Sequence, residues 1–104
     1  MKKLLVISPH PDDEVLGAGG ILLKAKKKGF KTKVLTISTN FPEPITKKRL
    51  DISLKESKQA HKILKVDKSV YFNIPTLTLS RQRIPNLTSK ISYEIKQFNP
   101  EIVI

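Results

Sequence analysis

Residues 4–20, LLVISPHPDDEVLGAGG, decide how the chain begins to fold. An apolar run leads through Ser8 and Pro9 to a histidine, and three consecutive acids and a glycine-rich segment follow. A short apolar run that ends at a proline is typical of a buried strand in a parallel sheet. Pro11 suits the first turn of a helix, because the N–H that proline lacks would have no intrahelical acceptor there. The acids suit the same turn because the helix dipole is positive at that end. This stretch therefore predicts a strand over Lys3–Ser8 and then a helix that stops at Gly29.

Strand and helix patterns alternate along the rest of the chain. Short apolar runs predict strands at Lys31–Ser38, over SVYFNI at residues 69–74, and in EIVI at residues 101–104. Apolar periodicity predicts helices at Thr46–Lys65 and Leu87–Phe98. The side chains expected on one face of the first of these helices are Leu50, Leu54, Ser57, Ala60, His61 and Leu64. The proline-containing segments STNFPEP and PTLTLSRQRIP predict irregular connections.

This order of elements predicts an α/β fold, a Rossmann-like doubly wound parallel sheet with right-handed crossovers. EIVI stands at the end of the sequence with no turn or helix after it. We therefore expect residues 1–104 to be the amino-terminal part of a single domain, truncated after its fourth strand.

Length and composition limit the class of protein. A chain of 104 residues has room for one domain, and 38% hydrophobic with 28% charged residues is ordinary for a soluble globular protein. No apolar run reaches the roughly 18 residues of a membrane span, and the apolar start is too short for a signal peptide. The absence of cysteine excludes disulfides and thiolate metal sites, and it fits a cytoplasmic location.

The formal charge of +11 is high enough to bind nucleic acid or an anionic membrane through charge alone. Several lysines, however, crowd the end of the first predicted helix, where cations complement the helix dipole. The few aromatic residues do not interleave with basic residues as a base-stacking surface requires. We interpret most lysines as solvated surface and expect no specific nucleic-acid partner.

The PHPDDE segment, residues 9–14, lies where a ligand site is expected, because open α/β sheets bind ligands beyond the carboxyl ends of their strands. His10 offers an imidazole nitrogen, and Asp13 offers a carboxylate from the first turn of the helix. Such a pair suits Zn²⁺, which in catalytic sites usually has three protein ligands and a water. Asp12 lies between them, close enough to act on a metal-bound water. The chain supplies no obvious third ligand.

Simpler interpretations exist for these residues. The acids can serve the helix dipole alone, although His10 and its two flanking prolines favour a site. Gly17, Gly19 and Gly20 each cost about 1 kcal/mol relative to alanine inside a helix, so they predict close backbone approach, of which tight helix-to-sheet packing is the plainest form. They do not form a dinucleotide-binding fingerprint. His61 is a weaker candidate for a third ligand, since its helix position predicts that it faces the sheet.

Three segments of the chain resemble one family. These are SPHPDDEVLGAGGILLKAKKKGFKTKVLTIS, LKESKQAHKILKV and FNPEIVI, at residues 8–38, 54–66 and 98–104. They resemble the amino-terminal portion of the LmbE-like, or PIG-L, family of zinc-dependent N-acetylglucosaminyl deacetylases. The resemblance implies a Rossmann-like fold, His10 and Asp13 as zinc ligands, and Asp12 as the general base.

The chain also departs from the family pattern. It has Ser38, Thr39 and Asn40 where members commonly carry a Thr-Asp-Gly-like turn. Ser53 replaces an arginine that is frequent three residues before the position of Glu56, and Arg49 lies one turn earlier. The third zinc ligand of the family is a histidine beyond the fourth strand, which this sequence does not reach.

The expected function is that of a zinc-dependent hydrolase, which removes the acetyl group from an N-acetylglucosamine-containing conjugate. The alternative is a catalytically incomplete α/β fragment or binding module. Such a module would need a downstream segment or a partner chain, would form a homo-oligomer, or would bind an anionic partner through its basic surface.

Overall fold

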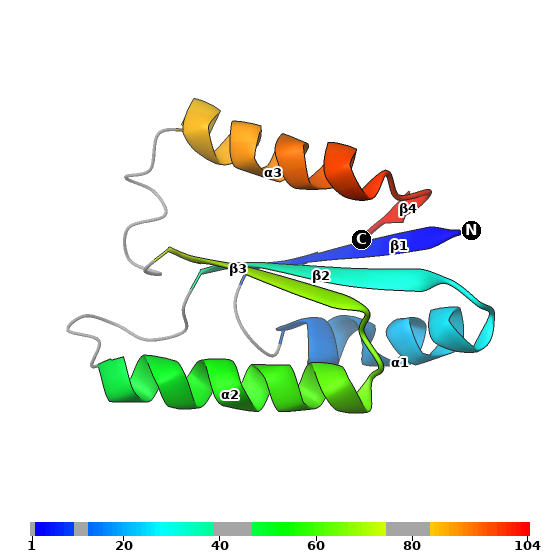
Figure 1. Ribbon diagram of the computed structural model, residues 1–104, viewed down its shortest axis with the longest axis horizontal. Coiled ribbons are helices and arrows are strands. Elements are labelled where there is room, and N and C mark those ends of the chain that lie inside the picture. Colours follow the sequence, from blue (N-terminus) through cyan, green and yellow to red (C-terminus); the bar gives the residue numbers. More distant parts are fainter. Residues whose placement is uncertain (1, 10–12, 39–46, 75–83) are drawn as a thin grey trace.

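The computed structural model describes residues 2–9, 13–38, 47–74 and 84–104. Strands and helices alternate in these segments (Figure 1). The elements are β1 (Lys3–Ser8), α1 (Asp13–Lys27), β2 (Lys31–Ser38), α2 (Lys47–Ile63), β3 (Lys68–Ile74), α3 (Ile84–Phe98) and β4 (Ile102–Val103). The strands form one parallel sheet in the order β3-β2-β1-β4. The predicted doubly wound parallel sheet is confirmed.

The helices cover the two faces of the sheet, so the molecule has three layers (Figure 1). Because side chains alternate between the faces of a strand, β1 and β2 contribute to both layers of core. Leu4, Val6 and Val34 pack with residues of α1 and with Leu64, whereas Leu5 and Leu35 pack under α3 against Phe98. Continuous apolar strands are needed where helices lie on both sides of the sheet.

The register of the sheet determines what meets at its carboxyl edge. β1 and β2 are paired from Lys3↔Lys31 to Ser8↔Thr36. On the other side of β1, the Ile7 N–H donates to the Ile104 carbonyl at 2.8 Å. β4 is therefore next to β1 as far as the end of the chain, and Ile104 lies beside the end of β1.

A left-handed residue follows each of the three described helices, and after α3 it is Asn99, with a φ of 51°. Gly29, just after α1, has a φ of 84°, a conformation that glycine adopts without strain. Lys65, just after α2, has a φ of 56°, and the Val66 N–H donates to the His61 carbonyl at 2.9 Å. This last-turn geometry closes α2 at Ile63, slightly earlier than the predicted end at Lys65. Thr46, the predicted start of this helix, lies outside the described residues.

The third helix begins earlier than its sequence pattern indicates. The prediction placed its start at Leu87 and included Ile84 and Pro85 in an irregular connection. In the structure α3 already begins at Ile84. Proline is well suited to the first turn of a helix because its missing N–H has no intrahelical acceptor there, and so Pro85 does not interrupt α3. Residues 75–83 of the predicted connection, and residues 39–44 of the earlier one, lie outside the described segments.

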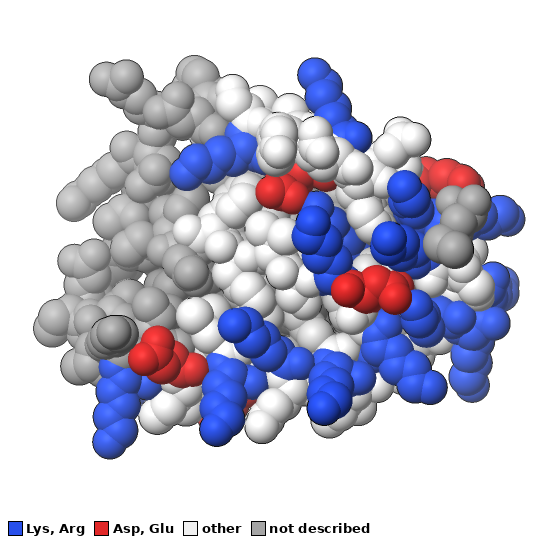
Figure 2. Space-filling model, in the orientation of Figure 1, with Lys and Arg blue, Asp and Glu red and all other residues white. Residues whose placement is uncertain are grey.

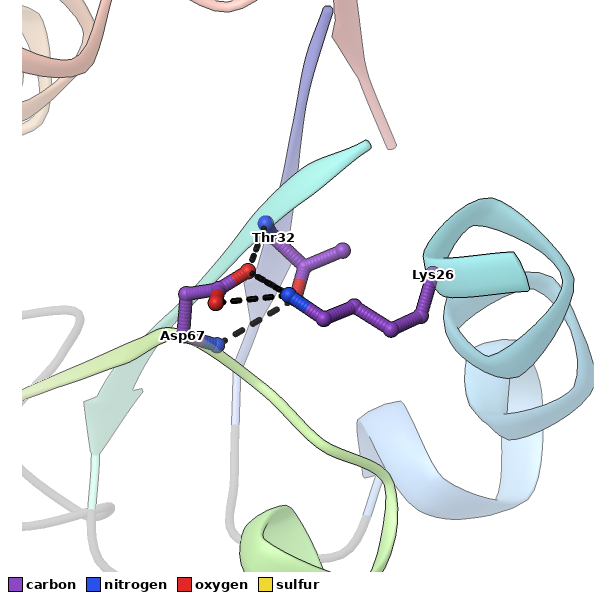
Figure 3. A network of polar contacts seen from close by, with 3 residues as sticks. All are labelled: Lys26, Thr32 and Asp67. Atoms are coloured by element: carbon purple, nitrogen blue, oxygen red, sulfur yellow. Dashed lines mark hydrogen bonds and ion pairs between the residues drawn. The ribbon is translucent and has the colours of Figure 1, made fainter. Parts of the chain in front are cut away.

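A polar cluster fixes the end of α1 against the amino ends of β2 and β3 (Figure 3). The Lys26 ammonium donates to both Asp67 carboxylate oxygens, at 2.6 and 2.7 Å. The Thr32 N–H donates to Asp67 Oδ2 at 2.8 Å. Partial burial raises the pKa of Asp67, but the hydrogen bonds from Lys26 and Thr32 outweigh this effect, so the pKa lies below its ordinary value. This cluster is at the edge of the sheet opposite to the carboxyl ends of the strands.

None of the helices in the described segments has the length and hydrophobicity that crossing a membrane would demand.

Candidate functional site

A small pocket opens at the carboxyl end of β1, where the sequence predicts the site. Its volume is about 190 Å³. Its described lining consists of Val6, Ile7, Ser8, Pro9, Gly17, Ala18 and Ile104. Three elements thus meet here: the end of β1, the first half of α1 and the end of the chain after β4. The sequence did not predict that Ile104 would line this pocket, although pairing of the last strand with β1 has this consequence.

Polar side chains are buried at this edge of the sheet. Ser8 and Thr36 are register partners and are only 2% and 1% exposed. The Thr36 hydroxyl oxygen is buried and has no hydrogen-bond partner among the described residues. Because buried polar atoms are nearly always satisfied, this hydroxyl marks a polar spot within an otherwise apolar sheet. The strand-end edge therefore has the polar character that a ligand site requires.

The segment that carries the predicted site residues follows directly after Pro9, which lines this pocket. His10 and Asp12 are outside the described residues, which resume at Asp13, the first residue of α1. Asp13 is therefore in the first turn of α1, as predicted, although its side chain is not among those described. Residues 10–12 join the end of β1 to the start of α1. The convergence of His10 and Asp13 on one metal ion stays a prediction.

The described side chains contain no alternative metal site. No group of three or more His, Asp or Glu side chains occurs among the residues that the structure describes. His61 is 3% exposed, and its Nδ1 lies 2.6 Å from the Ser69 hydroxyl and 3.3 Å from the Tyr71 hydroxyl. Ser69 is near the amino end of β3, so His61 belongs to the edge of the sheet away from the pocket. The prediction that His61 faces the sheet is confirmed.

The helix glycines do not have the tight contacts that were predicted for them. A Cβ built on Gly19 would approach Leu64 Cδ2 at 3.9 Å, an ordinary van der Waals distance. Cβ atoms built on Gly17 and Gly20 would meet no described atom within 4 Å. Among the described residues the expectation of close backbone packing is therefore wrong, because Gly17 and Gly20 are exposed and Leu64 leaves room for a Cβ on Gly19. Gly17 instead borders the pocket, whose space a larger side chain would enter.

Comparison with known proteins identifies the family. The family model described as PIG-L, GlcNAc-PI de-N-acetylase, matches residues 5–104. The chain belongs to the PIG-L family. The resemblance found in the sequence is confirmed, and the matched region includes both the PHPDDE segment and the last strand. No curated protein matches the chain.

Solved structures show the same fold in longer chains. The conserved protein TT1542 from Thermus thermophilus is 31% identical with a TM-score of 0.80; the match covers 99% of this chain and 45% of that one. N,N'-diacetylchitobiose deacetylase from Pyrococcus horikoshii is 27% identical with a TM-score of 0.83, over 98% of this chain and 39% of that one. This PIG-L chain thus spans less than half the length of these relatives.

A further structural neighbour carries a different chemistry. The 4-carboxy-2-hydroxymuconate hydratase GalB from Pseudomonas putida KT2440 has a TM-score of 0.83 at 22% identity, over 99% of this chain and 46% of that one. At this identity the likeness concerns the fold alone. The sheet of the PIG-L family therefore does not by itself determine the reaction, which has to be argued from the site.

Proposed function

We propose that the chain contributes to a zinc-dependent hydrolase that removes the acetyl group from an N-acetylglucosamine-containing conjugate. The main support is positional: the PHPDDE segment joins the end of β1 to the start of α1, at the edge of a parallel sheet where ligands bind. The family match over residues 5–104 supports the choice of deacetylation. A cytoplasmic site of action completes the proposal, since the sequence has no cysteine.

The donor atoms available at this edge fit a zinc ion. His10 would supply a nitrogen and Asp13 a carboxylate oxygen, the ligand types that zinc takes in hydrolases. When bound, zinc supplies a Lewis acid that polarises the acetyl carbonyl and makes water a stronger acid. The Thr36 hydroxyl, which has no hydrogen-bond partner among the described residues, is a polar group at the same edge of the sheet and supports this proposal. In many proteins, polar groups near a metal ion hydrogen-bond to its ligands and orient them.

Asp12 is the residue we assign to proton transfer. As general base it takes a proton from the water that attacks the acetyl carbonyl carbon. It then returns this proton to the sugar nitrogen as the carbon–nitrogen bond breaks. The products are acetate and a free amine, so the amide and one water are fully accounted for. The pocket beside Gly17 and Ile104 lies close enough to this segment to receive part of the substrate.

The last strand offers an edge for further pairing. Ile102, Val103 and Ile104 are 45 to 47% exposed, and β4 pairs with β1 along only one of its edges. An unpaired strand of apolar residues is a template for further pairing. We propose that a downstream segment, on the same or a separate chain, adds to β4 and brings the third zinc ligand to the pocket. A homo-oligomer or a catalytically incomplete binding module is the alternative.

Acetate release tests this proposal. The chain is assayed with an N-acetylglucosamine conjugate, alone and after joining to the part of TT1542 that extends beyond the matched region. The joined protein is expected to release acetate, and Asp12→Asn in the joined protein is expected to abolish most of the release. A joined protein that folds and binds zinc but releases no acetate from any N-acetylated sugar would contradict the proposed reaction.

A further inference from the structure

The outward side of α2 combines lysines with exposed isoleucines. At 100° per residue, Lys48, Ile52, Lys55, Gln59, Lys62 and Ile63 point away from the sheet, and we call these six residues the outer face of α2. All six are exposed, whereas Ser57, His61 and Leu64 on the opposite side are buried. None of the six is acidic, although Glu56 borders the face on one side and Asp51 on the other.

Positive charge is concentrated on the layer of helices that includes this face. Figure 2 shows Lys and Arg side chains along the lower edge of the molecule, over α1 and α2. The exposed cations of this layer include Lys24, Lys27 and Lys28 at the end of α1, besides those of α2. On α3, in the opposite layer, the exposed lysines are Lys90 and Lys96. Such a one-sided distribution produces a directed field that a uniformly charged surface lacks.

Exposed apolar side chains interrupt this basic surface. Ile63 is 77% exposed, more than any other large apolar side chain in the described segments, and Ile52 is 48% exposed. The two residues are three helical turns apart and therefore lie on the same side of α2. Beside them, the lysines at positions 48, 55 and 62 form a parallel row. Apolar side chains that enter the lipid and lysines that reach anionic headgroups are the two contributions by which a helix binds a membrane interface.

We propose that the outer face of α2 binds the surface of a bilayer that contains anionic phospholipids. The lysines would contact headgroup phosphates, and the two isoleucines would enter the boundary between headgroups and acyl chains. A shallow groove of about 420 Å³ runs along the same side of the helix, between Lys55, Lys58 and Lys62, and Asp51 is the one acidic residue in its described lining. This groove offers a further place for a phosphate group.

The exposed residues favour lipid over nucleic acid as the partner. Binding of single-stranded nucleic acid uses aromatic side chains as stacking surfaces. The outer face of α2 has none, and the exposed aromatic residue Tyr93 lies on α3 in the opposite layer. Contact with a phosphate backbone buries little of an isoleucine side chain, whereas its transfer into a lipid interface removes apolar surface from water and is favourable in free energy. The proposal does not depend on the catalytic assignment, because α2 contributes none of the proposed site residues.

Vesicle sedimentation provides the test. The 104-residue chain is mixed with vesicles of neutral phosphatidylcholine, or of phosphatidylcholine with roughly 30% phosphatidylserine, at about 0.15 M salt. Binding to the anionic vesicles only is expected. Lys55→Gln/Lys62→Gln is expected to weaken it by about ten- to thirty-fold, since each lysine near an anionic surface contributes about a fivefold change.

The matched control is Lys90→Gln/Lys96→Gln, which removes the same charge from α3. It is expected to weaken binding at most threefold. Equal losses in the two double variants would show that net charge alone attracts the chain and would overturn the proposal. Circular dichroism melts check that both variants keep the fold.

A second pair of substitutions tests insertion into lipid. Ile52→Ser/Ile63→Ser is expected to weaken vesicle binding by about tenfold without changing the net charge. Unchanged binding by this variant would contradict docking through the outer face. So would displacement of the wild-type chain from the vesicles by a short RNA at equal phosphate concentration, which would identify a polyanion and not a bilayer as the preferred partner.

Discussion

Lys33 and Glu94 form an ion pair inside the protein: the Lys33 ammonium donates to Glu94 Oε2 at 2.6 Å, and the lysine side chain is only 1% exposed. The pair joins the middle strand β2 to α3 across the core. The ammonium also lies 5.5 Å from the centre of the Phe98 ring, where the aromatic face attracts a cation. A buried cation thus has two partners that stabilise its charge.

We predict that Glu94→Leu destabilises the fold by about 3 kcal/mol, because it leaves the Lys33 ammonium buried without its counter-charge. The double variant Lys33→Met/Glu94→Leu is expected to recover most of the loss, since no buried charge remains. Urea denaturation of the three proteins measures the difference. A double variant as unstable as the single one would show that packing, and not charge, is what Glu94 provides.

The lowered pKa of Asp67 predicts that the fold loses stability at acid pH. Because its pKa in the folded state lies below the ordinary value of 3.8, its contribution is fully present above that value and is lost as the pH falls through the lowered pKa. Asp67→Asn is expected to cost about 1 kcal/mol near neutral pH and to make the remaining stability less sensitive to acid. Urea denaturation over a series of pH values checks this; parallel curves for both proteins would contradict it.

Much of the fold follows from local patterns in the sequence. The bounds of β1 and β2 match the prediction, because strands covered on both faces are short uninterrupted apolar runs. Lys33 shows where such patterns fail. A lysine in a strand is expected at the surface, and its partner Glu94 is 61 residues away, so only the folded chain reveals the pair. The start of α3 was missed because Pro85 was included in an irregular connection, although proline fits the first turn of a helix.

The location of the site could be predicted from the sequence, but the shape of its pocket could not. Its location follows from the strand that precedes PHPDDE and the helix that comes after it. The space around Gly17 and the approach of Ile104 depend on the spacing of α1 from the sheet and on the pairing of β4 with β1. Local sequence contains neither quantity.

Gly17 and Gly20 offer a test of the pocket. Gly17→Leu should fill part of the pocket and lower the acetate release of the joined enzyme by at least tenfold, whereas Gly20→Leu should leave release nearly unchanged. Both substitutions improve helix propensity by a similar amount, so stability does not distinguish them. Equal activity of the two variants would mean that the substrate does not enter this pocket.

Asp12 and Asp13 are expected to differ in what they do. In the joined enzyme, Asp12→Asn should reduce turnover by about 10² to 10⁴-fold with little loss of zinc, because a general base need not hold the metal. Asp13→Ala should lose zinc together with activity. Metal analysis of the purified variants beside their rates decides this. Equal zinc loss in both would show that the two carboxylates have been assigned wrongly.

Calorimetric zinc titration of the 104-residue protein measures whether this chain holds two zinc ligands, as we propose. We predict weak binding that His10→Ala and Asp13→Ala each remove and that His61→Ala leaves intact, because two ligands hold zinc less tightly than the usual three. Tight binding of one zinc per chain, or binding that survives both His10→Ala and Asp13→Ala, would show that the assignment of these two ligands is wrong.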